Sequence, residues 1–327
     1  MEEIIKPIDR ELIIAELTAD KLIGETRKGG NYLYEVTAFD SPNVMKEIGR
    51  LREIAFREGG GGTGKSMDID EFDIDEAHPY KQLIVWDPEN QEIMGGYRYH
   101  NCKELPGPEK LATSELFRFS EKFMREYFPR TIELGRSFVQ PMYQRTAFRR
   151  KGLFAMDNLW DGLGALIVKN PDIHYFFGKV TMYKSYNLKA RNILLNYMNI
   201  YLKDKENLVE AIEPLSYDEE NPEYAQIFNG LDSKEGYKVT QRLLKEHGEF
   251  VPPLINSYIN VSPSMKVFGT ADNIGFGGVE ETGILITIGD MFPEKTDRHI
   301  LPFREKLINA RENITNWWKR GPLRRRR

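Results

Sequence analysis

The chain has 327 residues, of which 40% are hydrophobic and 29% are charged, and its formal net charge at pH 7 is −4. A chain of this length can bury a complete hydrophobic core, and no apolar run reaches the roughly 18 residues that a membrane-spanning helix needs. One cysteine and five histidines exclude a disulfide framework and predict no metal site. The first residues are acidic where a secretory signal is basic, so we expect a cytoplasmic location.

Charge is distributed unevenly along the chain. Residues 319–327 hold six basic residues and no acidic one, which leaves 40 basic against 50 acidic residues, a net charge of −10, for the rest. Nucleic-acid binders need a broad basic surface. An acidic body with a cationic end therefore argues against nucleic acid as a partner.

The spacing of apolar residues predicts the helices and strands in chain order. We expect a helix over 9–23, a strand over 31–39, a helix over 43–57, a loop over 59–79, strands over 81–86 and 92–100, a helix over 114–127, a strand over 131–139, a helix over 152–169, a strand over 173–181, a helix over 186–202, a loop over 215–235, helices over 233–247 and 253–261, and a strand over 283–289. This order predicts an α/β (α+β) fold, with a mixed central sheet flanked by helices on both faces. We expect an N-terminal helical segment (1–30), a main domain (31–292) and a C-terminal helical extension with a basic tail (293–327).

Residues 59–66, GGGGTGKS, match the phosphate-loop pattern of nucleotide-binding proteins. Such a loop follows a strand and opens a helix, so that the helix N-terminus faces the phosphates. Here a predicted helix precedes the loop, and residues 68–76 after it carry six carboxylates that would repel a nucleotide. We therefore interpret the segment as a loop at the mouth of a site, with one or two of the acids recognising an amino substrate.

Residues 131–170 combine a charged strand, a basic loop and an apolar helix. The strand carries Glu133 and Arg136, and Gly152 opens the helix. Four cations fill the loop between them: Arg145, Arg149, Arg150 and Lys151. A helix start presents unpaired N–H groups and a positive dipole end, which together with these cations suit a phosphate group. The alternative is an ordinary strand–loop–helix unit with a solvated basic turn.

This stretch resembles the GNAT superfamily of acyltransferases. In that fold the fourth strand splays from the fifth, the pantetheine of the acyl carrier lies in the gap, and the following loop holds phosphate. The helix after the fifth strand often begins N-x-x-A, as at Asn187 to Ala190 here. The usual phosphate-loop pattern is not met, because Gly152 is the nearest glycine after Arg145.

Three segments, ELGRSFVQPMYQR, FGKVTMYKSYN and PPLINSYINVSPSMKVFG, are similar to the hemolysin-like branch of this superfamily. That branch contains the bacterial ornithine-lipid and glycine-lipid N-acyltransferases. The resemblance implies transfer of a 3-hydroxyacyl group from acyl carrier protein to the amine of an amino acid such as glycine or ornithine, in amino-lipid biosynthesis. It implies no permanently bound cofactor, since the phosphopantetheine of the carrier, or acyl-CoA, brings the acyl group.

A more distant resemblance, to acyl-homoserine-lactone synthases, implies a set of substrate-binding residues. The matching positions are Arg52, Phe56, Asp70, Asp73 and Arg98, followed by Glu133 and Arg136.

Amine attack on a thioester requires a proton acceptor, and we predict Glu133 on the central strand as this general base. The alternative is that Glu133 forms a structural ion pair with Arg136 or Arg98. The tetrahedral oxyanion needs donors, which we expect from the backbone N–H groups around Phe138 and Val139. Ser137 or Tyr143 would protonate the leaving thiolate, whereas Cys102 lacks the third group of a nucleophilic site.

Several questions stay open at the level of sequence. The donor is either acyl carrier protein or acyl-CoA, and the hemolysin label names a membrane-active protein as an alternative of another class. Six aromatic residues are candidates for the lining of an acyl tunnel, with the ordinary hydrophobic core as the alternative: Phe138, Phe148, Phe154, Trp160, Phe176 and Phe177. We expect residues 303–318 to form a helix. Its Trp317 and Trp318 stand next to basic residues in the sequence, which favours peripheral membrane contact. The alternative is that these residues belong to a solvated tail.

Overall fold

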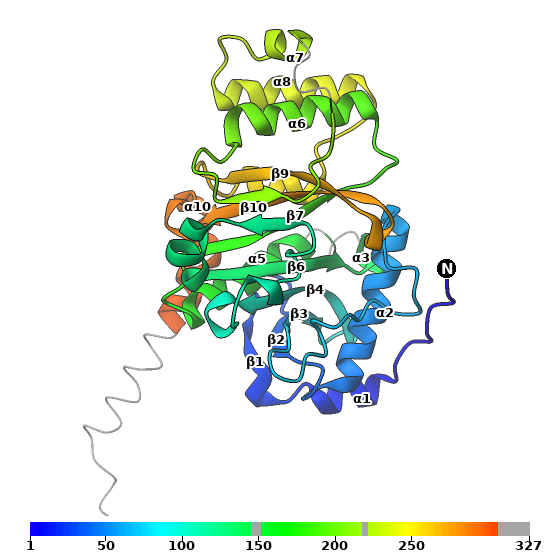
Figure 1. Ribbon diagram of the computed structural model, residues 1–327. Coiled ribbons are helices and arrows are strands. Elements are labelled where there is room, and N and C mark those ends of the chain that lie inside the picture. Colours follow the sequence, from blue (N-terminus) through cyan, green and yellow to red (C-terminus); the bar gives the residue numbers. More distant parts are fainter. Residues whose placement is uncertain (145–151, 153, 218–221, 307–327) are drawn as a thin grey trace, which may run out of the picture.

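The structure, a computed structural model, describes residues 1–144, 152, 154–217 and 222–306. Its centre is an eight-stranded sheet in the order β1-β2-β3-β4-β6-β7-β10-β9 (Figure 1). The strands are β1 Leu22–Glu25, β2 Tyr32–Val36, β3 Lys81–Asp87, β4 Glu92–Asn101, β6 Thr131–Val139, β7 Tyr175–Met182, β9 Lys266–Asn273 and β10 Val279–Thr287. Only β6 and β7 run parallel in this sheet, and the other neighbours are antiparallel. This mixed sheet confirms the predicted fold class.

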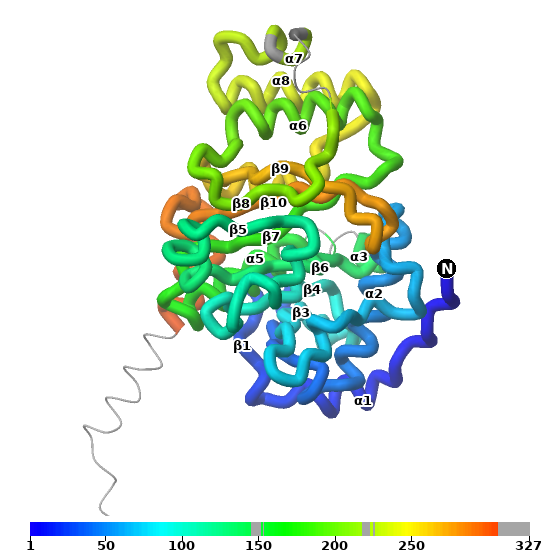
Figure 2. Tube along the Cα trace, in the orientation of Figure 1, coloured from blue at the N-terminus to red at the C-terminus, as the bar shows by residue number. Residues whose placement is uncertain are grey.

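Two layers cover the sheet, one on each face. On one face lie helix α2 (Pro42–Gly59) and a small second sheet of β5 (Phe117–Phe119) and β8 (Val209–Ala211). Figure 2 shows β5 and β8 side by side although they are far apart in sequence. On the other face lie α5 (Ala155–Lys169) and α9 (Pro253–Ile259), while α6 (Leu188–Leu202) and α8 (Ser233–Glu246) pack together beyond β9. The remaining helices are α1 Arg10–Glu16, α3 Pro141–Gln144, α7 Pro222–Ile227 and α10 Pro293–His299.

Helix α2 illustrates how the sequence builds one layer. Pro42 occupies its first turn, where a missing N–H costs nothing, and Gly60 ends it with a φ of 95°. Val44, Ile48 and Leu51 recur at helical spacing and are buried against the sheet. Each such side chain contributes about 1.5–3 kcal/mol on burial. The prediction of a helix over 43–57 is confirmed.

Two predicted helices are wrong where strands form instead. The helix expected over 9–23 ends at Glu16, and its last residues form β1 on the edge of the sheet. The helix expected over 114–127 is replaced by β5 and a π-helical turn, Phe123–Tyr127. The reason is tertiary packing, because Phe119 contacts Phe177 of β7 with ring centroids 5.5 Å apart.

The structure also contains strands that the sequence pattern did not indicate. β8 has three residues, and β9 carries Gly269 at a φ of 97° in its middle, which interrupts the alternation of a strand. β10 begins at Val279, earlier than the predicted strand over 283–289.

Both ends of the described chain contact the main sheet or its helices. The Ile8 N–H donates to Glu47 Oε2 of α2 (3.1 Å), and β1 extends the sheet edge. In α10, His299 Nδ1 lies 2.8 Å from Asp161 Oδ1 of α5. Within the described residues, no helix has the length and apolar character that crossing a membrane requires.

Candidate active site

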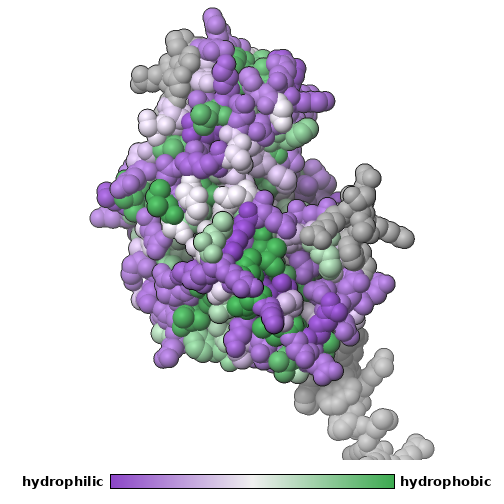
Figure 3. All heavy atoms as spheres, turned by 90° about the vertical axis from the view of Figure 1, so that its right-hand side faces the viewer, coloured by the Kyte–Doolittle hydropathy of each residue, from purple (hydrophilic) through white to green (hydrophobic). Residues whose placement is uncertain are grey.

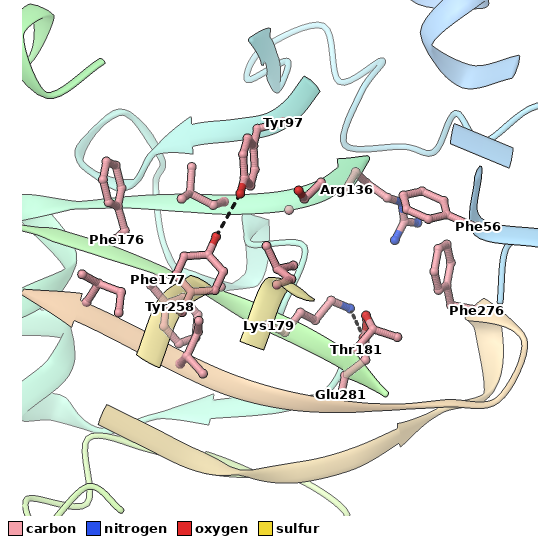
Figure 4. A pocket seen from close by; sticks show the side chains of 17 residues that line it. Phe56, Tyr97, Arg136, Phe176, Phe177, Lys179, Thr181, Tyr258, Phe276 and Glu281 are labelled. Carbon is pink, nitrogen blue, oxygen red and sulfur yellow. Dashed lines mark hydrogen bonds and ion pairs between the residues drawn. The ribbon is translucent and has the colours of Figure 1, made fainter. Parts of the chain in front are cut away.

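The parallel strands β6 and β7 separate halfway along their length. They pair only from Thr131 with Tyr175 to Leu134 with Gly178, although both continue for several residues. Beyond this point the gap opens into a pocket through the sheet (Figure 4). Its lining comes from β4, β6, β7, β10, α2 and α9, and from the turn before β10: Phe56, Tyr97, Leu134, Gly135, Arg136, Ser137, Phe176, Phe177, Gly178, Lys179, Thr181, Leu254, Tyr258, Phe276, Glu281, Ile284 and Ile286.

The surface on the side of α2, α3 and the β9–β10 turn is mixed in character. Figure 3 views this side and shows hydrophobic side chains gathered near its middle, bordered by hydrophilic ones. An apolar surface with a few polar groups around it is typical of small-molecule sites.

A β-bulge lies on β6 at the point where the gap opens. Gly135 pairs with Arg98 and Phe138 pairs with Gly96, so two residues of β6, Arg136 and Ser137, face Tyr97 alone. Arg136 has a φ of 47°, a left-handed conformation that is rare for arginine. Bulges leave a residue out of the ladder and often adjoin active sites. Both bulge residues, Arg136 and Ser137, line the pocket.

Phe138 and Val139, the predicted oxyanion donors, lie just beyond the bulge. Both are in register with β4, Phe138 with Gly96 and Val139 with Gly95. Neither residue lines the pocket. Their role stays a prediction, but the bulge at Ser137 is closer to the cavity.

One half of the pocket is apolar and lies on the face of α5 and α9. Leu134, Phe176 and Ile284 belong to the core beneath these helices. The hydroxyl groups of Tyr97 and Tyr258 are the polar groups in this apolar lining. Their two oxygens lie 3.4 Å apart. Burial raises the pKa of Tyr97, and it raises that of Tyr258 well above the ordinary value. Both hydroxyls therefore stay protonated at neutral pH and can donate.

The other half is charged and lies on the face of α2. Alternate residues of a strand share a face, so Lys179 and Thr181 lie on the same side as Phe177. Lys179 forms an ion pair with Glu281 of β10, and Thr181 Oγ1 donates to Glu281 Oε1 at 3.2 Å. Asn273 Nδ2 donates to the second oxygen, Oε2, at 2.8 Å. Glu281 is 3% exposed, so a held carboxylate and an ammonium group face the gap.

Beside this half runs a buried chain of alternating arginines and aspartates, which we call the arginine–aspartate chain. Its members in order are Arg52, Asp73, Arg98, Asp70, Arg136 and Asp68. The N···O distances between neighbours range from 2.5 Å for Arg98–Asp70 to 3.3 Å for Arg52–Asp73 and Arg98–Asp73. The structure thus brings together five of the residues that sequence reasoning assigned to the substrate or the reaction.

Burial and pairing act in opposite directions within this chain. Burial alone raises the pKa of Asp70, but Arg98 and Arg136 outweigh it and hold that pKa well below the ordinary value. Burial raises the pKa of Asp68, and its arginine neighbours offset only part of the effect. Within the arginine–aspartate chain, the surroundings therefore favour the ionised form of Asp70 and disfavour that of Asp68.

Phe56, predicted to bind substrate, lines the pocket from α2. Its ring meets that of Phe276 edge to face, with centroids 5.1 Å apart. The Arg136 guanidinium lies over the Phe276 ring at 4.3 Å. Phe56, Phe276 and Arg136 thus form one end of the pocket (Figure 4).

Glu133, the predicted general base, is buried and is not among the residues that line the pocket. Tyr80 donates to one carboxylate oxygen, and Thr113 donates to the other through its N–H (3.0 Å) and its hydroxyl (2.6 Å). Neither ion pair weighed for Glu133 forms, because Arg98 and Arg136 pair with aspartates instead. The carboxylate oxygens of Glu133 are thus held by Tyr80 and Thr113 and do not line the pocket.

Of the predicted phosphate-binding residues, the structure describes Gly152; Arg145, Arg149, Arg150 and Lys151 lie outside the described residues. Gly152 passes so close to Tyr143 that an added Cβ would lie 1.8 Å from the Tyr143 carbonyl oxygen. Only glycine fits this approach of the chain before α5.

The glycine-rich loop over residues 59–66 surrounds a carboxylate of the protein itself, that of Glu53. Glu53 of α2 accepts hydrogen bonds from the N–H groups of Thr63 (3.0 Å) and Gly64 (2.8 Å) and from the Thr63 hydroxyl (2.8 Å). Arg57 Nε donates to the same carboxylate at 2.7 Å. A carboxylate in this position competes directly with a phosphate group, which agrees with the interpretation against nucleotide binding.

The remaining candidates have mixed outcomes. Of the six aromatic residues considered for an acyl tunnel, Phe176 and Phe177 line the pocket. The Trp160 ring packs on Tyr258 with centroids 5.5 Å apart, and Phe138 lies in the core beneath α2. Lys28 Nζ lies over the Phe154 ring, and Phe148 is outside the described residues. Of the two predicted general acids, Ser137 lines the pocket and the Tyr143 hydroxyl donates to Asp87 at 2.9 Å. Burial raises the pKa of the Cys102 thiol well above its ordinary value, so it is a poor nucleophile.

Sequence reasoning missed Lys179, Glu281, Tyr97 and Tyr258. Lys179 is the only charged residue of β7, and Glu281 is one of two buried glutamates in β10, a pattern that signals a function or a partner. Their pairing depends on the register between β7 and β10, which local sequence does not encode.

Comparisons with known proteins identify a family and two relatives with high sequence identity. Residues 51–151 match the acetyltransferase (GNAT) domain family. The chain is 52% identical over 314 residues to a glycine N(alpha)-acyltransferase of Bacteroides thetaiotaomicron, covering 95% of this chain and 93% of the relative. It is also 52% identical to one of Phocaeicola vulgatus over 307 residues, 93% of this chain and 94% of the relative.

Two solved structures show a weaker likeness. One is FeeM, an N-acyl amino acid synthase from uncultured soil microbes, with a TM-score of 0.38 and 9% identity over 80% of this chain and 93% of that one. The other is a CoA-dependent acyl-homoserine lactone synthase, with a TM-score of 0.29 and 15% identity over 50% of this chain and 72% of that one.

Proposed function

The chain belongs to the family of glycine N(alpha)-acyltransferases and is an acyltransferase of the GNAT type, and from this premise we propose that it transfers a fatty acyl group from a thioester donor to the amine of glycine. The observation that carries the proposal is the pocket between β6 and β7, with a bulge on one wall and a charged pair on the other.

The bulge supplies the means to activate the thioester. We place the carbonyl oxygen of the bound donor against the backbone N–H groups of Arg136 and Ser137, the two bulge residues that line the pocket. Such donors stabilise the negative charge that develops on oxygen in the transition state, an effect typically worth 10²–10³ in rate for a single donor. The apolar half of the pocket, with Phe176 and Ile284, suits the acyl chain.

The reaction releases two protons from the glycine ammonium, one before attack and one as the amide forms. The C–S bond breaks, the C–N bond forms, and the thiolate takes up one of these protons. Two carboxylates stand as acceptors for the other. Glu281 lines the pocket, whereas Glu133 acts only through the Tyr80 hydroxyl that donates to it. The protonated Tyr97, Tyr258 and Ser137 hydroxyls are the available donors to the thiolate.

For the donor we propose acyl carrier protein, with its phosphopantetheine in the gap and acyl-CoA as the alternative. Carrier proteins are acidic, and Arg149 and Arg150 belong to the basic segment between β6 and α5 to which the resemblance assigns phosphate binding. Charge reversal at both residues should raise KM for the carrier-bound donor and flatten its dependence on salt, because salt screens steering by exposed charges. An equal effect on a pantetheine thioester would indicate a local phosphate contact instead.

Incubation of the purified chain with palmitoyl carrier protein or palmitoyl-CoA, and with glycine or ornithine, tests the function. Mass spectrometry should detect N-acylglycine, and absence of product with every pair would refute the proposal. We further propose that this product enters amino-lipid synthesis. Lipids from cells that overexpress the chain should then contain acylated glycine.

A further inference from the structure

We infer that the Lys179–Glu281 pair is the binding site for the zwitterion of the acceptor, with Lys179 holding the carboxylate and Glu281 the ammonium group. This inference rests on the proposed function and extends it by assigning the residues that select an α-amino acid over a simple amine.

The first step concerns which charges face the cavity. Its lining holds three charged side chains, Arg136, Lys179 and Glu281. Arg136 is already neutralised by Asp68 and Asp70, at 2.9 and 3.2 Å. In the part of the chain that the structure describes, Glu281 is the only acidic partner of Lys179. An ammonium group has three donors, so Lys179 retains donors for a second anion.

The second step concerns what holds Glu281 in place. Thr181 and Asn273 donate to its two oxygens at 3.2 and 2.8 Å, independently of Lys179. Lys179 can therefore turn part of its hydrogen bonding to a ligand without leaving Glu281 unpartnered. A buried charge without partners is costly, and this arrangement avoids that cost in both states.

The third step is chemical complementarity. In a free amino acid, a carboxylate and an ammonium group are both bonded to the α-carbon. The Lys179–Glu281 pair presents one positive and one negative group on neighbouring strands. Binding of the ammonium to Glu281 also places a carboxylate next to the nitrogen that must lose a proton. The pair lies on the α2 face, opposite the apolar half that suits the acyl chain. Donor and acceptor thus approach the gap from opposite faces of the sheet.

The experiment compares two acceptors, glycine and glycinamide, which lacks the carboxylate. The quantity measured is the ratio of kcat/KM for glycine to kcat/KM for glycinamide, with the palmitoyl donor that the wild-type chain uses. This ratio does not depend on the fraction of folded enzyme. Lys179→Gln removes the charge yet keeps a hydrogen-bond donor for Glu281, and Lys179→Arg restores the charge.

We expect Lys179→Gln to lower the ratio about 10- to 100-fold, the range for losing a hydrogen bond to a charged group. The loss should appear mainly as a higher KM for glycine, and Lys179→Arg should recover part of it. Lys184→Gln is the matched control, because Lys184 pairs with Asp272 and Glu280 and does not line the pocket. It should leave the ratio unchanged.

An unchanged ratio in Lys179→Gln, or an equal loss with both acceptors, would overturn the inference. Failure of the wild-type chain to acylate glycine at all would instead refute the proposed function. The two failures are therefore distinguishable.

Discussion

At the scale of single residues, buried charge is tolerated because each charged group has partners fixed by the fold. Asp70 lies between Arg98 and Arg136, at 2.5 and 3.2 Å, and Asp73 joins Arg98 to Arg52. Removing one member leaves its neighbours of opposite charge with one counter-charge fewer. The arginine–aspartate chain should therefore respond to substitution as a unit.

Asp70→Asn should lower the free energy of unfolding at pH 7 by about 3 kcal/mol, as expected for breaking a buried pair. The folded-state pKa of Asp70 lies below its unfolded value near 3.9, so ionised Asp70 stabilises the fold. This contribution is complete above about pH 5, begins to decline as pH falls below about 4, and is lost as pH falls through the lower folded-state pKa. Urea unfolding of both forms at pH 7 and pH 3.5 measures the difference, which should shrink at the lower pH.

Asp75→Asn is the control for an exposed pair on the same segment. The Lys110 side chain lowers the pKa of Asp75 to about 2. Solvent screens this pair, so its loss should cost at most about 1 kcal/mol. An equal loss in both variants would contradict the special role of the buried chain.

The two candidate proton acceptors differ in their distance from the reacting groups. Because Glu281 lines the pocket and Glu133 does not, Glu281→Gln should lower kcat with glycine by the roughly 10²–10⁴-fold of a lost general base, and Glu133→Gln by less. Single-turnover rates at saturating donor measure both. The reverse order would restore Glu133 as the base, acting through Tyr80.

At the scale of elements, the site depends on two interruptions of regular structure. The bulge at Arg136 and Ser137 shifts β6 out of register with β4, and the parting of β6 from β7 opens the gap. A continuous ladder would fill both places with backbone hydrogen bonds. The connection from α3 to α5 adds a third constraint, since Gly152 touches the backbone of Tyr143.

Gly152→Ala should therefore disturb the entry to α5. The added methyl group meets a backbone oxygen and cannot be accommodated by a side-chain rotation, so we expect a loss of about 1–3 kcal/mol in unfolding free energy and a higher KM for the acyl donor. Gly289→Ala is the control, because nothing lies within 4 Å of its added Cβ. A donor KM unchanged in Gly152→Ala would show that this connection does not shape the donor site.

At the scale of the whole molecule, the C-terminal extension divides into a docked part and a basic end. His299, Ile300 and Phe303 are buried against the body, so the docked part includes α10 and the residues after it. The basic end, 319–327, carries six cations next to Trp317 and Trp318. Each basic residue near an anionic membrane surface contributes about 1 kcal/mol.

We expect the full chain to co-sediment with vesicles that contain anionic lipid at low salt, and a chain ending at Lys306 to remain in the supernatant. Truncation at Lys306 spares His299 and Phe303, whose loss would expose core. Neutral vesicles serve as the control. Equal sedimentation of both chains would refute membrane contact through the basic end and leave the acyltransferase function untouched.

Much of this protein follows from local sequence. Apolar periodicity marks α2, α5, β3, β4 and β6 because each buries one side against a neighbouring layer. The motif resemblance indicated an acyltransferase. It also implied that Arg52, Asp70 and Asp73 bind substrate, and the fold brings these three side chains into one cluster. The acids after the glycine-rich loop argued against a nucleotide site, and in the structure that loop donates hydrogen bonds to Glu53.

Tertiary structure decided the features that depend on partners distant in sequence. β5 forms in place of a helix because its phenylalanines pack on β7, and Glu133 pairs with Tyr80 and Thr113 rather than with an arginine. The Lys179–Glu281 pair exists only because β10 is antiparallel to β7 in one register. A shift of one residue in that register would turn the pair to opposite faces, since side chains alternate along a strand.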